Sequence, residues 1–281
     1  MIKEYHYNEA FSWPNGCRVA VGLTFDFQGG EHVKPMANGL MDNEEYSIGE
    51  YGPNTGIWRL LKMLDEEGVK GTFLTCGAIA ERYPDAVKTI VAKGHEIAGH
   101  GYHHEVARTL KPEEESDVIS RATAMIQSRT GHKPVGWRSC TQSNNTISLL
   151  LDHGYLWNSN SFSHDLPFLW ERDGKILVEL PRQPYGDGRG YAHFDSGTPE
   201  TALTIWKRAF NQLHREGKTE PRYVPFQIHP YISGRPGRAD ALQEMIQYMK
   251  QAEGVWFGTG NEIAHWCLEN VFKLNRVARV S

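Results

Sequence analysis

The segment GHEIAGHGYHHE, from Gly94 to Glu105, places four histidines within twelve residues. Two of them, His100 and His104, are four positions apart, so one helical turn or a tight loop could direct both imidazoles at the same point. Paired imidazoles are suited to binding a divalent metal, but such a pair also occurs in solvated polar loops. The choice between these interpretations depends on the other polar residues of the chain.

Three other segments place polar side chains where predicted strands end. The segment LTFDFQGGE offers Asp26 and Glu31, GWRSCTQ offers Arg138, and FQIHP offers His229. The carboxyl ends of parallel strands meet on one face of a domain, and active residues gather there. We therefore expect these side chains to share one cavity with the two histidines. Taken singly, Arg138 would also fit a surface ion pair, and His229 a hydrogen-bonded core histidine.

A carboxylate with two imidazoles is a ligand set for a borderline divalent metal such as zinc, with positions left open for water and substrate. Asp26, His100 and His104 would supply these groups. A metal held in this way lowers the pKa of bound water towards about 7 and polarises a carbonyl, which is what amide hydrolysis requires. A second carboxylate or histidine must then move protons.

Predicted strands and helices alternate over the whole length. The patterns predict strands at residues 17–27, 71–77, 96–98, 175–181, 223–230 and 255–258. They predict helices at residues 55–70, 84–94, 111–131, 146–155, 198–217, 238–254 and 261–272. This alternation indicates an α/β fold with a parallel sheet, and a barrel is the favoured form. Because no linker or repeat interrupts it, residues 1–281 are expected to form a single domain.

Two glycine-rich or polar segments, residues 29–54 and 186–197, are longer than simple connections require. Such segments usually carry a binding function or a subunit contact. We expect a homo-oligomer with at least one of these segments at an interface.

Composition excludes several classes of protein. The 281-residue chain is 40% hydrophobic with a net charge of −4, so it is globular and has no basic footprint for nucleic acid. No apolar run approaches the roughly 20 residues that span a bilayer. The first residues lack the apolar stretch of a signal peptide, so a cytoplasmic location is expected. The four cysteines are scattered without a CxxC pair, and only Cys140, close to Arg138, leaves a nucleophilic role open.

Four motifs in this order resemble those of the polysaccharide deacetylase superfamily, which is built on the NodB homology domain. TFDFQGG resembles the first motif of that family, HGYHH its H-x-x-x-H motif, RSCT weakly its arginine motif, and FQIHP its late histidine motif. The resemblance covers residues 19–266. It implies a distorted (β/α)7 barrel, similar to a TIM barrel, that hydrolyses carbon–nitrogen bonds other than peptide bonds.

The resemblance also implies roles for individual residues. Asp26 would be the general base and a metal ligand, His100 and His104 the other metal ligands, and His229 the general acid that protonates the leaving nitrogen. The second acidic position of the family falls at Phe27 or Gln28 here, and a neutral Gln28 would bind a dication less strongly. The residues expected to bind substrate are Glu31, Arg138 and Asp165. Asp165 and its neighbour His164 would equally fit a turn before Pro167.

Other segments are similar to the branch of this family that contains bacterial allantoinases, among them EYGPNTGIWRLLK and QGGEH. Three functions follow, in order of preference. The first is a hydrolase of a small amide, cyclic ureide or cyclic imide, which the lack of an export signal favours. The second is a metal-dependent deacetylase of polysaccharides or N-acetyl sugars. The third is an inactive barrel that serves as a binding module, which Gln28 alone favours.

Overall fold

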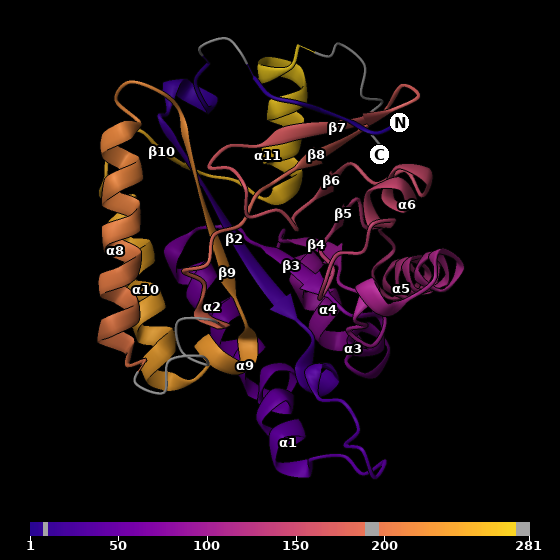
Figure 1. Ribbon diagram of the computed structural model, residues 1–281. Helices are drawn as coiled ribbons and strands as arrows, with labels where there is room; N and C mark the ends of the chain where they lie inside the picture. Colours follow the sequence, from indigo (N-terminus) through magenta and orange to yellow (C-terminus); the bar gives the residue numbers. More distant parts are fainter. Residues whose placement is uncertain (8–10, 189–196, 274–281) are drawn as a thin grey trace.

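Strand β2 (Val19–Phe27) lies at the centre of the sheet, and all nine of its residues are buried. Its nearly continuous apolar sequence fits a parallel strand covered on both faces. One edge of β2 pairs in parallel with β9 (Arg222–Ile228). The other edge pairs first with β10 (Val255–Phe257) and then with β3 (Thr72–Thr75), also in parallel. Figure 1 shows β2 and β9 side by side, with α1 (Asn43–Tyr51) beyond the carboxyl end of β2.

The sheet continues from β3 through parallel neighbours to an antiparallel end. The parallel strands are β4 (Glu96–Gly99), β5 (Gly136–Trp137), β6 (Trp157–Asn158) and β8 (Lys175–Glu179). β7 (Phe168–Arg172) pairs antiparallel with β8, and β1 (Lys3–Tyr5) pairs antiparallel with β7. The predicted α/β class with a parallel sheet is confirmed, whereas the antiparallel end was not predicted. In the part of the chain described, no ladder joins β9 to the far end of the sheet.

Helices pack around the sheet. They are α1, α2 (Ile57–Glu67), α3 (Gly77–Arg82), α4 (Pro84–Ala92), α5 (Pro112–Thr130), α6 (Thr146–Asp152), α8 (Pro199–Glu216), α9 (Pro230–Ser233), α10 (Pro236–Lys250) and α11 (Gly260–Trp266). In Figure 1, α8 and α10 lie on one side of β2 and α5 and α6 on the other. α2 shows why these segments are helical and pack on the sheet. Its buried residues recur at helical spacing, and Gly68 ends it with φ of +65°.

This computed structural model describes residues 1–7, 11–188 and 197–273. Residues 29–54 are not a simple loop, because they form a short helix (Gly29–His32), α1, and the start of a π-helical turn (Gly52–Gly56). Asp42 caps α1 by accepting hydrogen bonds from the backbone N–H groups of Glu44 and Glu45. Of the second long segment, residues 186–188 are described and 189–196 lie outside the described residues.

Within residues 1–7, 11–188 and 197–273, none of the helices combines the length and the apolar character needed to span a bilayer.

Candidate active site

Asp26 lies near the carboxyl end of β2, and its side chain is buried. Its Oδ1 accepts a hydrogen bond from Arg138 Nη1 at 2.5 Å, and its Oδ2 accepts one from Gln227 Nε2 at 2.6 Å. Burial would raise the pKa of Asp26, but the guanidinium of Arg138, with smaller contributions from His100 and His229, holds it below its ordinary value. Asp26 is therefore ionised at neutral pH.

Arg138 forms hydrogen bonds inside the protein beside Asp26. Its Nε donates to the carbonyl of Ser159, its Nη2 to the Ser159 hydroxyl, and its Nη1 to Asp26 and to Thr24 Oγ1. The side chain is 1% exposed, and these bonds use four of the five N–H donors of the guanidinium. These bonds position Asp26, and a contact between Arg138 and substrate stays a prediction.

His100 follows β4 and faces Asp26. Its Nδ1 is 2.6 Å from the carbonyl oxygen of Arg138, so Nδ1 carries the proton and Nε2 has the lone pair. Nε2 is buried without a hydrogen-bond partner, 4.0 Å from Asp26 Oδ2. Burial lowers the pKa of His100 to about 4, so the imidazole is neutral. The lone pair of His100 Nε2 thus faces the Asp26 carboxylate, and a hydrogen-bond donor such as water between the two could bond to both.

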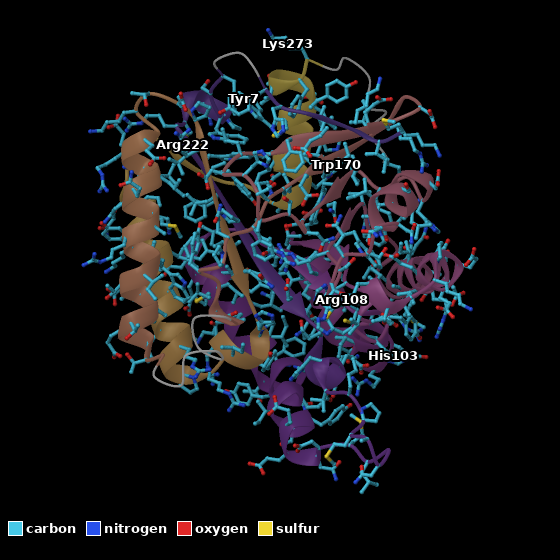
Figure 2. All side chains as sticks on the ribbon, in the orientation of Figure 1. Tyr7, His103, Arg108, Trp170, Arg222 and Lys273 are labelled. Carbon is cyan, nitrogen blue, oxygen red and sulfur yellow. The ribbon has the colours of Figure 1, made fainter. Side chains whose placement is uncertain are left out.

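His104 is held near His100 by a tight loop rather than by a helix. The Glu105 carboxylate accepts hydrogen bonds from the backbone N–H groups of Tyr102 and His103, and His104 has φ of +53°. The His100 and His104 ring centroids are 4.8 Å apart. Burial holds the pKa of His104 well below its ordinary value. His103 points outward, and Figure 2 labels it at the molecular surface.

His229 ends β9 and forms a dyad with Asp187. Its Nδ1 is 2.6 Å from Asp187 Oδ1, while Asp187 Oδ2 accepts hydrogen bonds from the His229 backbone N–H and the Ser233 hydroxyl. Its Nε2 is 3.8 Å from Asp26 Oδ2. Burial would lower the pKa of His229, but the charge of Asp187 and its hydrogen bond raise it above its ordinary value. A raised pKa favours the protonated imidazole, which is the form a general acid needs.

Asp187 is the functional residue that the motifs missed. Its carboxylate is fully buried, and it comes from the second long glycine-rich segment, which carries no motif of its own. The length of that segment was the only signal of its importance. The next residue, Gly188, has a reason to be glycine, because a Cβ there would lie 2.9 Å from Cε1 of His229.

A cavity of about 290 Å³ opens over the site. Gln227 and His229, which both lie against Asp26, line it together with Cys140, Phe162, Arg182 and Tyr231. The Arg182 guanidinium lies 4.4 Å from the centroid of the Phe162 ring, so one wall of the cavity is cationic and aromatic. Asp26, His100 and His229 meet within about one small substrate's reach, as the sequence predicted.

Comparison with known proteins identifies the family. A family model described as polysaccharide deacetylase matches residues 49–162. A crystal structure described as that of a polysaccharide deacetylase from Mycobacterium smegmatis is 30% identical, with a TM-score of 0.86, and the match covers 99% of this chain and 98% of that one. The chain belongs to the polysaccharide deacetylase family.

Two other relatives of this deacetylase-family chain are a peptidoglycan deacetylase and an allantoinase. A peptidoglycan deacetylase of Helicobacter pylori is 28% identical over 79% of this chain and 86% of its own length. The crystal structure of Puue allantoinase is 27% identical, with a TM-score of 0.81, and the match covers 91% of this chain and 92% of that one. Together these relatives support an enzyme that hydrolyses carbon–nitrogen bonds.

The family supports a divalent metal as cofactor, but the predicted ligand set fits one poorly. Both oxygens of Asp26 already accept hydrogen bonds, one of them from a guanidinium whose charge opposes a dication. Phe27, one of the two residues expected at the family's second acidic position, is apolar and fully buried. Among the described residues, no group of three metal-binding atoms within 4.8 Å of one another includes Asp26, His100 and His104. Two buried atoms without a hydrogen-bond partner, His100 Nε2 and Gln28 Oε1, favour a cation.

Two further predicted residues, Glu31 and Asp165, are held by contacts with other side chains. Glu31 forms ion pairs with Arg82 and His103, at 2.6 and 2.8 Å. Asp165 accepts a hydrogen bond from Gln183, which does line the cavity. Their contacts with substrate stay predictions. Cys140 also lines the cavity, but burial raises the pKa of its thiol, which does not favour a nucleophile.

Proposed function

We propose that this protein hydrolyses a small amide, a cyclic ureide or a cyclic imide, with Asp26 as base and His229 as acid. The observation that carries the proposal is the placement of the Asp187–His229 dyad, whose Nε2 lies 3.8 Å from a carboxylate kept ionised by Arg138. The pKa of Asp26 is lowered and that of His229 is raised. One group therefore favours the unprotonated form of a base and the other the protonated form of an acid, as acid–base catalysis needs.

The mechanism follows from these positions. The separations from Asp26 Oδ2 to His100 Nε2 and His229 Nε2, 4.0 and 3.8 Å, exceed a direct hydrogen bond and suit a bridging water or substrate atom. Asp26 orients the attacking water and takes its proton as the oxygen bonds to the carbonyl carbon. The carbon–nitrogen bond of the tetrahedral intermediate then breaks as His229 Nε2 gives its proton to the leaving nitrogen. Asp187 keeps His229 in the correct tautomer.

The cavity favours a small substrate over a polymer. A volume of about 290 Å³ is at the lower end of the range for small-molecule sites. Arg182 and Tyr231 would hydrogen-bond a carbonyl oxygen, while His100 Nε2 would accept from a substrate N–H. A cyclic ureide or imide presents both groups in one plane, and Phe162 offers an aromatic surface beside it.

The second candidate is a metal-dependent deacetylase of N-acetyl sugars or polysaccharides, with zinc as the metal. The lone pair of His100 Nε2 and the unpartnered Gln28 Oε1 are the observations that favour it. We also propose that the chain acts as one catalytic domain, as a homo-oligomer and in the cytoplasm.

A substrate panel separates the two candidates. We expect kcat/KM for allantoin, hydantoin or succinimide to exceed that for N-acetylglucosamine oligomers, with activity retained after exhaustive chelation. His229→Gln and Asp26→Asn should both abolish that activity, whereas His132→Ala, an exposed histidine away from the cavity, should retain it. Turnover of the oligomers alone, lost on chelation and restored by zinc, would establish the second candidate instead.

A further inference from the structure

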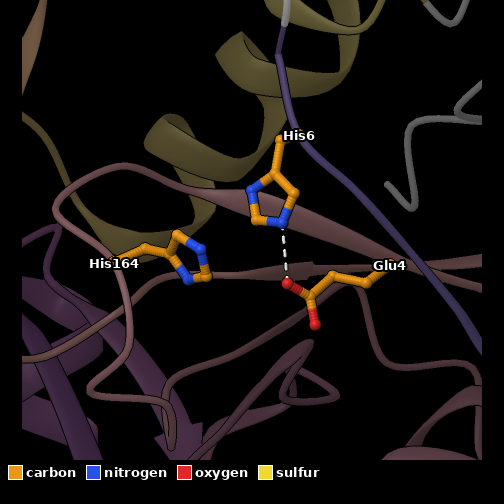
Figure 3. Close-up of side chains that lie close together, drawn as sticks. All are labelled: Glu4, His6 and His164. Atoms are coloured by element: carbon orange, nitrogen blue, oxygen red, sulfur yellow. Dashed lines mark hydrogen bonds and ion pairs between the residues drawn. The ribbon is translucent and has the colours of Figure 1, made fainter.

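A second group of metal-binding side chains lies away from the cavity. Glu4 and His6 come from the amino-terminal segment, and His164 comes from the segment between β6 and β7. One ligand atom from each lies within 4.8 Å of the other two, the one such group found among the described residues. Figure 3 shows the His164 ring beside the hydrogen-bonded pair of His6 and Glu4. We propose that these three residues bind a divalent metal of the zinc class at the surface.

The surrounding structure holds the two imidazoles together. His6 and His164 have ring centroids 4.4 Å apart, and both rings pack against the buried ring of Phe168, at 5.3 and 4.9 Å. Ser163 Oγ lies 2.6 Å from His164 Nδ1, so with Nδ1 protonated the Nε2 lone pair is available for a metal. A hydrogen bond on the far nitrogen is the usual way a protein orients a histidine ligand.

The chemistry of the group suits zinc or a similar ion. Two imidazoles and one carboxylate are a standard zinc ligand set, with at least one further position left to water. Ligand atoms about 2 Å from a tetrahedral ion lie roughly 3.4 Å from one another, so closing the site requires movements of about 1 Å. Such movements are open to these side chains, because those of His6 and Glu4 are 44% and 36% exposed.

Metal binding would tie together two segments, one of which reaches the cavity. His6 directly follows β1, whereas His164 shares its segment with Phe162, which packs against Arg182 in the cavity wall. An ion bridging His6 and His164 would therefore restrain the segment that forms one wall of the substrate cavity.

The test is a titration of metal-stripped full-length protein with Zn²⁺, followed by calorimetry, and with Co²⁺, followed by its visible absorption. We expect the wild type to bind one more ion than His6→Ala or His164→Ala. Glu4→Gln should bind that ion about tenfold or more weakly, because it keeps the shape but loses the charge. Zn²⁺ should raise the thermal midpoint of the wild type more than that of the variants.

The control is His132→Ala, which removes an exposed imidazole elsewhere and should leave the stoichiometry at the wild-type value. An ion that persists in both His6→Ala and His164→Ala belongs to another site. Equal stoichiometry and affinity in the wild type and all three variants would overturn the proposal. So would a wild type that binds no ion, which would leave a hydrogen-bonded His6–Glu4 pair and nothing more.

Discussion

The leaving nitrogen of an amide needs a proton, and His229 is placed to supply it. We expect His229→Ala to lower kcat by about 10²- to 10⁴-fold, the usual contribution of a positioned acid, with a much smaller change in stability. The reason is that its Nε2 faces Asp26 and the cavity, while the backbone contact with Asp187 does not need the ring. Turnover and thermal midpoint should be measured on the same sample. A large loss of stability with near-normal turnover would mark a core histidine instead.

Asp187 should act through His229. Asp187→Asn removes the charge that raises the pKa of His229, so this imidazole should lose its proton at lower pH. We expect the alkaline limb of the kcat/KM profile to move to lower pH. Ser233→Ala removes one hydrogen bond to Asp187 and keeps its charge, so it should shift the limb much less. An unshifted profile with a lowered thermal midpoint would reduce Asp187 to a structural role.

The short helix α9, which begins directly after His229, is positioned by a close approach of two backbones. A Cβ on Gly56 would lie 2.1 Å from the carbonyl oxygen of Pro230, and a Cβ on Gly234 would lie 2.5 Å from the Cα of Gly56. Backbone atoms cannot move aside as a flexible side chain can. The π-helical turn at residues 52–56 therefore fixes the position of the residues that carry the acid.

We accordingly expect Gly56→Ala to lower both the thermal midpoint and kcat, because α9 must move to accommodate the methyl group. The matched control is Gly237→Ala in α10, where the nearest atom to a new Cβ is 3.9 Å away. That variant should be neutral or slightly stabilising, since alanine favours helix over glycine. If Gly56→Ala matched the control in both measurements, the backbone contact would not position α9.

The stability of the whole molecule should depend on pH through His95. This histidine is buried, its Nδ1 accepts a hydrogen bond from the Gly71 N–H, and burial, with help from Lys70, lowers its pKa to about 4. The folded state favours the neutral ring, so this contribution is complete above the unfolded pKa near 6.5. It is lost as pH falls from about 6.5 to about 4.

We expect the free energy of unfolding to fall by about 2 to 3 kcal/mol from this group over that window. His95→Asn cannot be protonated, so its stability should depend less on pH there, although its absolute stability is lower. Urea unfolding at a series of pH values measures both proteins. Parallel curves for the two would show that His95 does not titrate between the folded and unfolded states.

At the scale of the molecule, patterns that depend on local periodicity could be predicted from the sequence. The predicted strand at residues 223–230 is β9 (Arg222–Ile228), and the predicted helix at residues 198–217 is α8 (Pro199–Glu216). β7 and β1 escaped prediction because they are short and antiparallel, and only their pairing with β8 and with each other defines them.

The sequence by itself determined the family, the α/β class, and the presence of Asp26, His100, His104 and His229 at strand ends, because these depend on residue type and spacing. Only the tertiary structure decided what each residue does. In the folded protein the Arg138 guanidinium forms an ion pair with Asp26. Asp187 hydrogen-bonds to His229, 42 residues further along the chain, and the His164 ring packs against that of His6. Those outcomes depend on which atoms meet once the sheet is formed, and spacing along the chain carries no record of contacts made between distant segments.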